Sequence, residues 1–107
     1  MRRGDIVSIV QPGAYGNPRP ALIIQSDLFS MHPSVTVLPI TSDLRDTPLF
    51  RLNVEPSESN GLRTTSQVMI DKITTVPREK AGNVFGKLEA DALKKAQGLL
   101  AVWLGIV

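Results

Sequence analysis

Residues 21–25 read Ala-Leu-Ile-Ile-Gln, an apolar run typical of a strand that is covered on both faces. A loop rich in proline and glycine precedes it at residues 11–18, and a β-branched run follows it at Val35–Ile40. Pro39 predicts a bulge or a sheet edge near the end of that second run, because proline cannot donate to a ladder of hydrogen bonds. The sequence therefore predicts a β-rich fold with at least one buried strand.

Shorter strand patterns occupy most of the remaining chain. These strands are expected at residues 5–10, 50–54, 67–70, 73–76 and 83–85. Asn60-Gly61 predicts a turn in the polar stretch before residue 67. The sequence has no internal repeat, low-complexity tract or linker, so we expect one domain over residues 1–107.

From Glu89 onward the apolar period becomes that of a helix. Its apolar stripe consists of Leu93, Ala96, Leu100 and Trp103. Gly98 within this helix predicts close backbone packing, and Gly105 predicts its end. The expected fold class is mostly β with one α element: a small, strongly bent sheet or barrel closed by the C-terminal helix.

Composition excludes several kinds of chemistry. The chain has no cysteine, which removes disulfides and thiolate nucleophiles, and its one histidine, His32, cannot form a histidine pair or a His-rich zinc site. We therefore expect no metal and no cofactor. The net charge of +2 permits a polyanionic partner without indicating one.

Size and hydropathy suggest the cellular setting. No segment resembles a secretory signal or reaches the length of a membrane span, and the lack of cysteine fits a reducing cytoplasm. We therefore expect a cytoplasmic protein without membrane association. A chain of 107 residues can bury only a small core and has a modest margin of stability. Burial of more surface between two copies would add to it, so we expect a homodimer.

Arg19 is the first candidate for a functional residue. It lies between Pro18 and Pro20, whose restricted backbone holds it rigidly at the start of an apolar strand. A guanidinium held in this way suits bidentate contact with a phosphate. The alternative is an ordinary surface arginine beside a strand.

Further candidates lie at strand ends and in the first loop. Thr41-Ser42 can donate hydroxyl hydrogens to a phosphate, or can simply form a turn. Asp71 is an acid/base candidate, or one half of a surface ion pair with Lys72. Tyr15 can stack on an unpaired base, or can anchor its loop.

The sequence has no Walker loop, no dinucleotide fingerprint, no nucleophile elbow and no metal-ligand spacing. An enzyme without an obvious nucleophile is consistent with a ribonuclease, because RNA supplies its own 2′-hydroxyl. The protein then has only to hold the strand, neutralise the phosphate and move protons.

Five stretches together resemble the MazF/PemK/Kid toxins of bacterial toxin–antitoxin systems. They are residues 3–7 (Arg-Gly-Asp-Ile-Val), 19–24 (Arg-Pro-Ala-Leu-Ile-Ile), 37–42 (Val-Leu-Pro-Ile-Thr-Ser), 61–72 (Gly-Leu-Arg followed by Ser-Gln-Val-Met-Ile-Asp-Lys) and 100–105 at the helix end. The similarity runs essentially from end to end, in the order and spacing of that family.

This resemblance implies a Src-homology-3-like barrel, a homodimer and cleavage of single-stranded RNA that leaves a 2′,3′-cyclic phosphate. It also implies a cognate MazE-like antitoxin whose disordered C-terminal segment blocks the RNA groove. The catalytic residues by position are Arg19, Thr41 and Asp71. The RNA contacts we expect are Tyr15, Asn17, Ser42, Gln67 and Lys72, and the dimer contacts are Leu100, Trp103 and Leu104.

One departure from the family pattern concerns acid/base chemistry. The Kid-like branch has an arginine two residues before the aspartate, where this chain has Met69, so Arg19 and Thr41 must carry more of the work. The main alternative is a CcdB-like gyrase poison without nuclease activity, because the chain ends Trp103-Leu104-Gly105-Ile106-Val107, close to the CcdB tail. An inactive barrel that only binds a partner is a third possibility.

Overall fold

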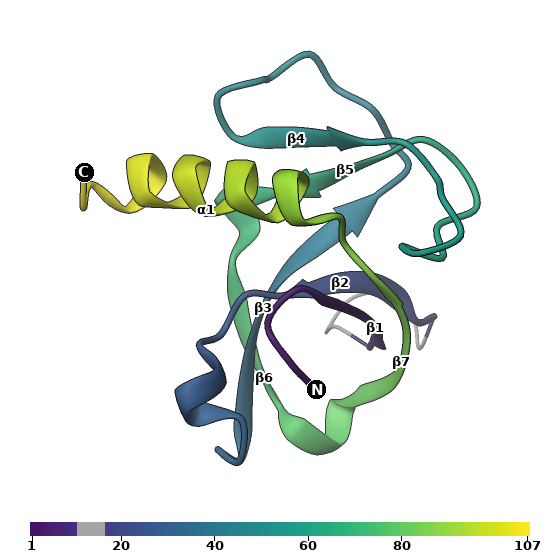
Figure 1. The fold of residues 1–107 in the computed structure, drawn as a ribbon, viewed down its shortest axis with the longest axis vertical. Helices are drawn as coiled ribbons and strands as arrows, with labels where there is room; N and C mark the ends of the chain where they lie inside the picture. The colour runs from purple at the N-terminus through teal and green to yellow at the C-terminus, as the bar shows by residue number, and fades with distance from the viewer. Residues whose placement is uncertain (11–16) are drawn as a thin grey trace.

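The computed structural model describes residues 1–10 and 17–107, a bent antiparallel sheet with one long helix across it (Figure 1). The strands are β1 (Asp5–Ile9), β2 (Arg19–Ile23), β3 (Ser34–Thr41), β4 (Arg51–Val54), β5 (Ser66–Met69), β6 (Thr74–Pro77) and β7 (Ala81–Lys87). The helices are the 3-10 turns η1 (Asp27–Phe29), η2 (Ile70–Lys72) and η3 (Arg78–Lys80) and the α-helix α1 (Ala90–Leu104). Each predicted strand and the terminal helix are present, with shifted ends.

The strands follow the order β4-β5-β3-β2-β1-β7, with β6 beside β3. All pairings are antiparallel. Within the described residues the order has two ends, β4 and β7, so backbone pairing does not close the sheet. The strongly bent sheet of the prediction is confirmed, whereas the closed barrel is not.

Pro39 lies in the interior of the sheet and not at an edge. β3 pairs with β2 on one side, and on the other it pairs first with β6, up to Val37, and then with β5, from Ile40. Pro39 falls between these two partners, where a missing N–H interrupts no continuous ladder. The predicted edge was wrong because the sequence does not show that one strand has two successive neighbours on the same side.

The central strands are apolar on both faces, as the run at residues 21–25 predicted. Alternate residues point to opposite sides of the sheet, so each central strand contributes side chains to two separate apolar clusters. One cluster contains Val7, Ile9, Ala21, Ile23, Val35, Val37 and Val76. The other, which includes Ala96 of α1, contains Ile6, Leu22, Ile24, Leu38, Ile40, Val54, Val68, Ile70 and Leu88.

Helix α1 covers the second cluster and runs alongside β4 and β5 (Figure 1). It ends where predicted, at Gly105, whose φ of 72° is left-handed and whose N–H bonds back to the last turn. No helix in the described part of the chain is long and apolar enough to cross a membrane.

Gly98 does not fulfil its predicted role. It lies on the exposed side of α1, and a side-chain carbon added there would meet nothing within 4 Å. The residue therefore contributes no close packing within the described chain, and its backbone entropy is an uncompensated cost.

We expect Gly98→Ala to stabilise the fold by about 0.5–1 kcal/mol, because alanine removes that cost without a clash. Urea unfolding followed by circular dichroism measures the change. Gly105→Ala is the matched control in the same helix: its left-handed backbone is strained by a side chain, so that variant should be less stable than the parent. A destabilising Gly98→Ala would show that something covers this side of α1.

Candidate functional site

An open groove crosses one side of the molecule where β2 begins and β3 ends. Its walls come from these two strand ends, from the segment before β5, from the two ends of β5 and from single residues of β1 and β7. The lining residues are Ser8, Pro18, Arg19, Pro20, Pro39, Ile40, Thr41, Ser42, Asp43, Gly61, Leu62, Arg63, Thr64, Ser66, Met69 and Phe85.

Arg19 and Thr41 share this groove because of the β2–β3 register. Ala21 pairs with Pro39 at the end of the β2–β3 ladder, and Arg19 and Thr41 each lie two residues beyond this pair. Because side chains alternate along a strand, both point to the side of Ala21 and Pro39, and both line the groove. The structure therefore brings together the arginine and the hydroxyl that the sequence singled out separately.

Thr41 is arranged to donate a hydrogen bond. Its Oγ1 accepts the backbone N–H of Asp43 at 3.0 Å, which occupies one of the acceptor positions of the hydroxyl. The hydroxyl hydrogen has no partner among the described residues and is free to point at a ligand. Ser42, the next residue, is exposed and also lines the groove.

The charges at the groove suit an anion. Arg19 and Arg63 both line it, and neither forms an ion pair within residues 1–10 and 17–107. The carboxylate of Asp43 is the one acidic group among the described lining residues, and it pairs with Arg45 at 3.2 Å. Two unpaired guanidinium groups can therefore act on a phosphate chain.

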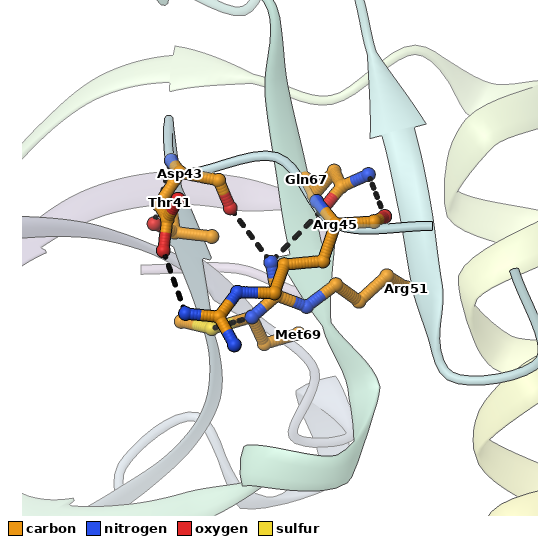
Figure 2. Close-up of polar contacts among 6 residues, drawn as sticks. All are labelled: Thr41, Asp43, Arg45, Arg51, Gln67 and Met69. Carbon is orange, nitrogen blue, oxygen red and sulfur yellow. Dashed lines mark hydrogen bonds and ion pairs between the residues drawn. The ribbon is translucent and has the colours of Figure 1, made fainter. Parts of the chain in front are cut away.

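Gln67 differs from its predicted role as an RNA contact. It is only 5% exposed, and its amide makes four hydrogen bonds within the chain. Figure 2 shows Gln67 between Arg45 and Arg51. Its partners are Arg45, Arg51 and Asn53. With both amide hydrogens and the carbonyl oxygen in use, Gln67 serves as an internal scaffold and not as a ligand-binding group.

Asp71 and Lys72 lie outside the groove. The chain leaves β5 after Met69 and turns into η2, which carries both residues towards α1. One oxygen of Asp71, Oδ1, is buried without a hydrogen-bond partner in the described structure, and Asp71 is not among the groove-lining residues. Direct proton transfer from Asp71, as predicted, has no support in this geometry.

Two further predicted contacts lie near the first loop. Asn17 is exposed next to the lining residue Pro18 but is not itself part of the lining. Tyr15 falls outside the described residues.

Sequence reasoning missed Asp43, Arg51 and Arg63. Asp43 directly follows Thr41-Ser42, so its place at the strand end was a usable signal. Arg63 follows the Asn60-Gly61 turn. The turn is predictable, but the sequence does not show that the residues after it lie beside the ends of β2 and β3. Arg51 lies on a strand whose partner, β5, cannot be identified from the pattern.

A sequence model of the "PemK-like, MazF-like toxin of type II toxin-antitoxin system" matches residues 2–104. The chain belongs to this family. The match favours the MazF-like interpretation over the CcdB-like alternative. Within the described residues, no group of three or more His, Cys, Asp or Glu side chains could hold a metal ion.

Similar proteins extend over essentially the whole toxin. The "Probable endoribonuclease MazF" of Mycolicibacterium smegmatis is 48% identical over 107 residues, covering 99% of this chain and 98% of its own. The Mycobacterium tuberculosis toxin MazF-mt6 has a TM-score of 0.79 at 26% identity, covering 95% of this chain and 98% of its own.

A third similar structure supports the fold alone. It is an endoribonuclease from a Mycobacterial species in complex with its cognate antitoxin. Its TM-score is 0.83 at 23% identity, and the match covers 100% of this chain and 97% of that chain.

The wall that carries Arg63 is fixed to the rest of the toxin through Asn60. The Asn60 side chain is fully buried and accepts the N–H groups of Ser57 and Leu62, both at 3.0 Å. Gly86 of β7 lies so close that a side chain there would overlap the Asn60 carbonyl oxygen. The predicted Asn60-Gly61 turn is thus confirmed and packed against β7.

Glu89 ties the same segment to the start of α1. Its carboxylate accepts the hydroxyls of Ser57 and Ser59, both at 2.6 Å, and the amide of Asn60 at 3.2 Å. The Ser57 hydrogen bond, then that of Ser59, stabilises the charged form and lowers the Glu89 pKa from 4.5 to about 2.

We expect this carboxylate to make the toxin resistant to mild acid. Because the folded pKa lies below the unfolded value, its contribution is fully present above pH 4.5 and is lost as the pH falls towards about 2. Unfolding free energies of the parent and Glu89→Gln, measured across this range, should differ most at neutral pH and converge in acid. A constant difference at all pH values would contradict the assignment.

Proposed function

We propose that this toxin is an endoribonuclease that cuts single-stranded RNA without a metal ion. The observation that carries the proposal is the placement of Arg19 and Thr41 on one face of one open groove. The 48% identity to a protein named as an endoribonuclease supports the same activity. We also propose that the bent sheet is a form of the SH3-like barrel. Residues 1–107 then make up one domain, which acts in the cytoplasm.

The reaction follows from what RNA supplies. The 2′-hydroxyl gives up its proton and its oxygen attacks the adjacent phosphorus. The bond from phosphorus to the 5′-oxygen breaks, that oxygen takes a proton from water, and the products are a 2′,3′-cyclic phosphate and a 5′-hydroxyl. Arg19 holds the phosphate through its planar fork, and the Thr41 hydroxyl donates to an oxygen on which negative charge grows. Both act through positioning and electrostatics, so neither has to change its protonation state.

Proton transfer needs a group other than arginine, whose pKa exceeds about 12 in proteins. Neither Asp71 nor a histidine is among the described residues that line the groove. We assign the role of proton acceptor to the Asp43 carboxylate, either directly or through a water molecule. It is the one acidic side chain among the described lining residues, and the backbone N–H of the same residue donates to the Thr41 hydroxyl.

The groove also suits the other proposed partners. Ser42, Asn17 and Tyr15 contact RNA beside the scissile phosphate in this proposal, and Lys72 acts only through longer-range attraction. A cognate antitoxin covers the groove with a segment that folds on binding, and carboxylates in that segment would satisfy Arg19 and Arg63. A similar toxin was solved in complex with its antitoxin, which is consistent with this arrangement.

The C-terminal part of α1 is the proposed dimer contact. Trp103 and Leu104 are each 50% exposed, and Val102 beside them is 60% exposed. Trp103 packs against Phe50 with ring centroids 6.0 Å apart, while Leu100 packs against the second apolar cluster. An apolar helix end with this exposure is better buried by a second copy than left in water.

The decisive experiment incubates the toxin with labelled RNA in excess EDTA. We expect discrete fragments with cyclic phosphate ends, and a loss of at least about tenfold in rate for Arg19→Lys, which keeps the charge but not the fork. Thr41→Val, nearly equal in size, should lose a similar factor. Equal activity of Arg19→Lys and the parent would rule out the bidentate clamp.

Intact RNA, together with trapped gyrase–DNA complexes, would instead support the CcdB-like alternative. Removal of residues 105–107 separates the two further. A gyrase poison should lose its toxicity with the dimer intact, whereas a ribonuclease should tolerate the cut if the dimer survives.

The dimer contact is tested by Leu104→Glu, which places a charge on the proposed interface. We expect this variant to sediment as a monomer, because the charge would otherwise be buried without a partner. Leu28→Glu is the matched control on η1, where the leucine is 88% exposed, and it should leave the dimer unchanged. If the Leu104→Glu variant is still a dimer, the interface does not lie at the end of α1.

A further inference from the structure

We propose that Arg51 is a positioning residue of the groove, which holds the Asp43 carbonyl so that the Thr41 hydroxyl stays aimed at the phosphate. This inference rests on the proposed ribonuclease function. It concerns a side chain that does not line the groove, so Arg51 acts through its neighbours and not by touching RNA.

The guanidinium of Arg51 joins two strands and a turn (Figure 2). Its Nη1 donates to the Asp43 carbonyl oxygen at 2.8 Å and to Gln67 Oε1 at 3.0 Å. Its Nη2 lies 3.6 Å from the sulfur of Met69, its direct partner across the β4–β5 pair. One planar group thus connects β4, β5 and the turn that follows β3.

Gln67 gives this connection a rigid base. It is the cross-strand partner of both Thr41 and Asn53. Besides the Arg51 bond, its amide donates to the Asn53 side chain at 2.7 Å and to the Arg45 carbonyl at 2.9 Å. A buried amide with all its positions occupied has little freedom to rotate, so Arg51 is bound to a fixed point.

The other end of the connection is the Thr41 hydroxyl. The two backbone groups of Asp43 serve opposite neighbours: its carbonyl accepts from Arg51, and its N–H donates to Thr41 Oγ1 at 3.0 Å. Releasing the carbonyl would free this short turn to rotate, and the N–H that orients the Thr41 hydroxyl would move with it. The path from Gln67 to Thr41 is therefore continuous.

The hydrogen-bond geometry favours arginine at position 51. Nη1 alone donates to both oxygen acceptors, and the ammonium of a lysine, which is one bond nearer the backbone, would stop short of them. No carboxylate in the described structure lies within ion-pair distance of Arg51, so its main bonds are to neutral oxygens. Geometry, and not charge pairing, is what this side chain supplies.

The first test compares Arg51→Lys and Arg51→Gln with the parent in single-turnover and steady-state RNA cleavage. We expect both variants to lose between about tenfold and a hundredfold in kcat with KM changed by less than about threefold, because misplaced groups cost rate more than binding. Thermal unfolding of each variant checks that the protein is folded. Full activity of Arg51→Lys would overturn the proposal, since charge alone would then be sufficient.

Arg78→Gln is the matched control from η3, outside the groove. Like Arg51, Arg78 donates to backbone carbonyl oxygens, those of Ser30 and His32, so the variant removes one positive charge and leaves the turn at Asp43 held as before. Its kcat should stay within about twofold of the parent. A loss equal to that of the Arg51 variants would assign the effect to net charge and overturn the positioning role.

A double-mutant cycle tests the path itself. If Arg51 acts through the hydroxyl, Arg51→Lys should change kcat by less than about threefold in a Thr41→Val background. Additive losses would show that Arg51 acts independently of Thr41, and would overturn the inference.

A measurement without RNA separates this inference from the proposed function. Nuclear magnetic resonance of the free protein should show the Asp43 amide shifted and exchanging faster in Arg51→Lys, with the Asp43 signals of Arg78→Gln close to the parent. Unchanged Asp43 signals would overturn the positioning role even in an active enzyme. If the parent fails to cut RNA but Arg51→Lys still changes the Asp43 amide signal, only the proposed activity would be overturned.

Discussion

The antiparallel register of β2 against β3 is the constraint on which the groove depends. Ala21 lies opposite Pro39, and from this pairing every second residue on both strands faces the same side. A slip of one residue would turn Arg19 to the opposite face and would also exchange the two apolar clusters. The packing that stabilises the sheet therefore also fixes the relation between the guanidinium and the hydroxyl.

β3 holds this register because three strands bond to it. It pairs with β2 along one side and with β6 and then β5 along the other. Position 39 is where the second side changes partner, so a proline there fits the backbone. The same change of partner places Thr41 beside Gln67, which links the groove to the interior.

Local pattern was sufficient to predict the strands, the terminal helix and its end at Gly105. It also made Arg19 and Thr41 candidates, because flanking prolines and a strand end are local features, while their catalytic roles come from the family resemblance and stay predictions. The closed barrel was not confirmed, and closure depends on pairing between distant strands. The sequence did not show that the Gln67 amide is buried or that a 3-10 turn follows Met69 and carries Asp71, because both depend on neighbours that it does not name.

In the described residues three strands, β4, β6 and β7, have a neighbour on one side only, and these borders have a consequence for the behaviour of the protein at high concentration. β4 is only four residues long and carries Arg51, whose charge opposes the approach of another strand. β6 is also four residues long and ends in Pro77, which has no N–H to pair. The pairing of β7 with β1 shifts register twice, which leaves that edge twisted and irregular. None of these borders offers a long, flat row of unpaired amides as a template, so the fold is poorly suited to strand-by-strand stacking into fibrils.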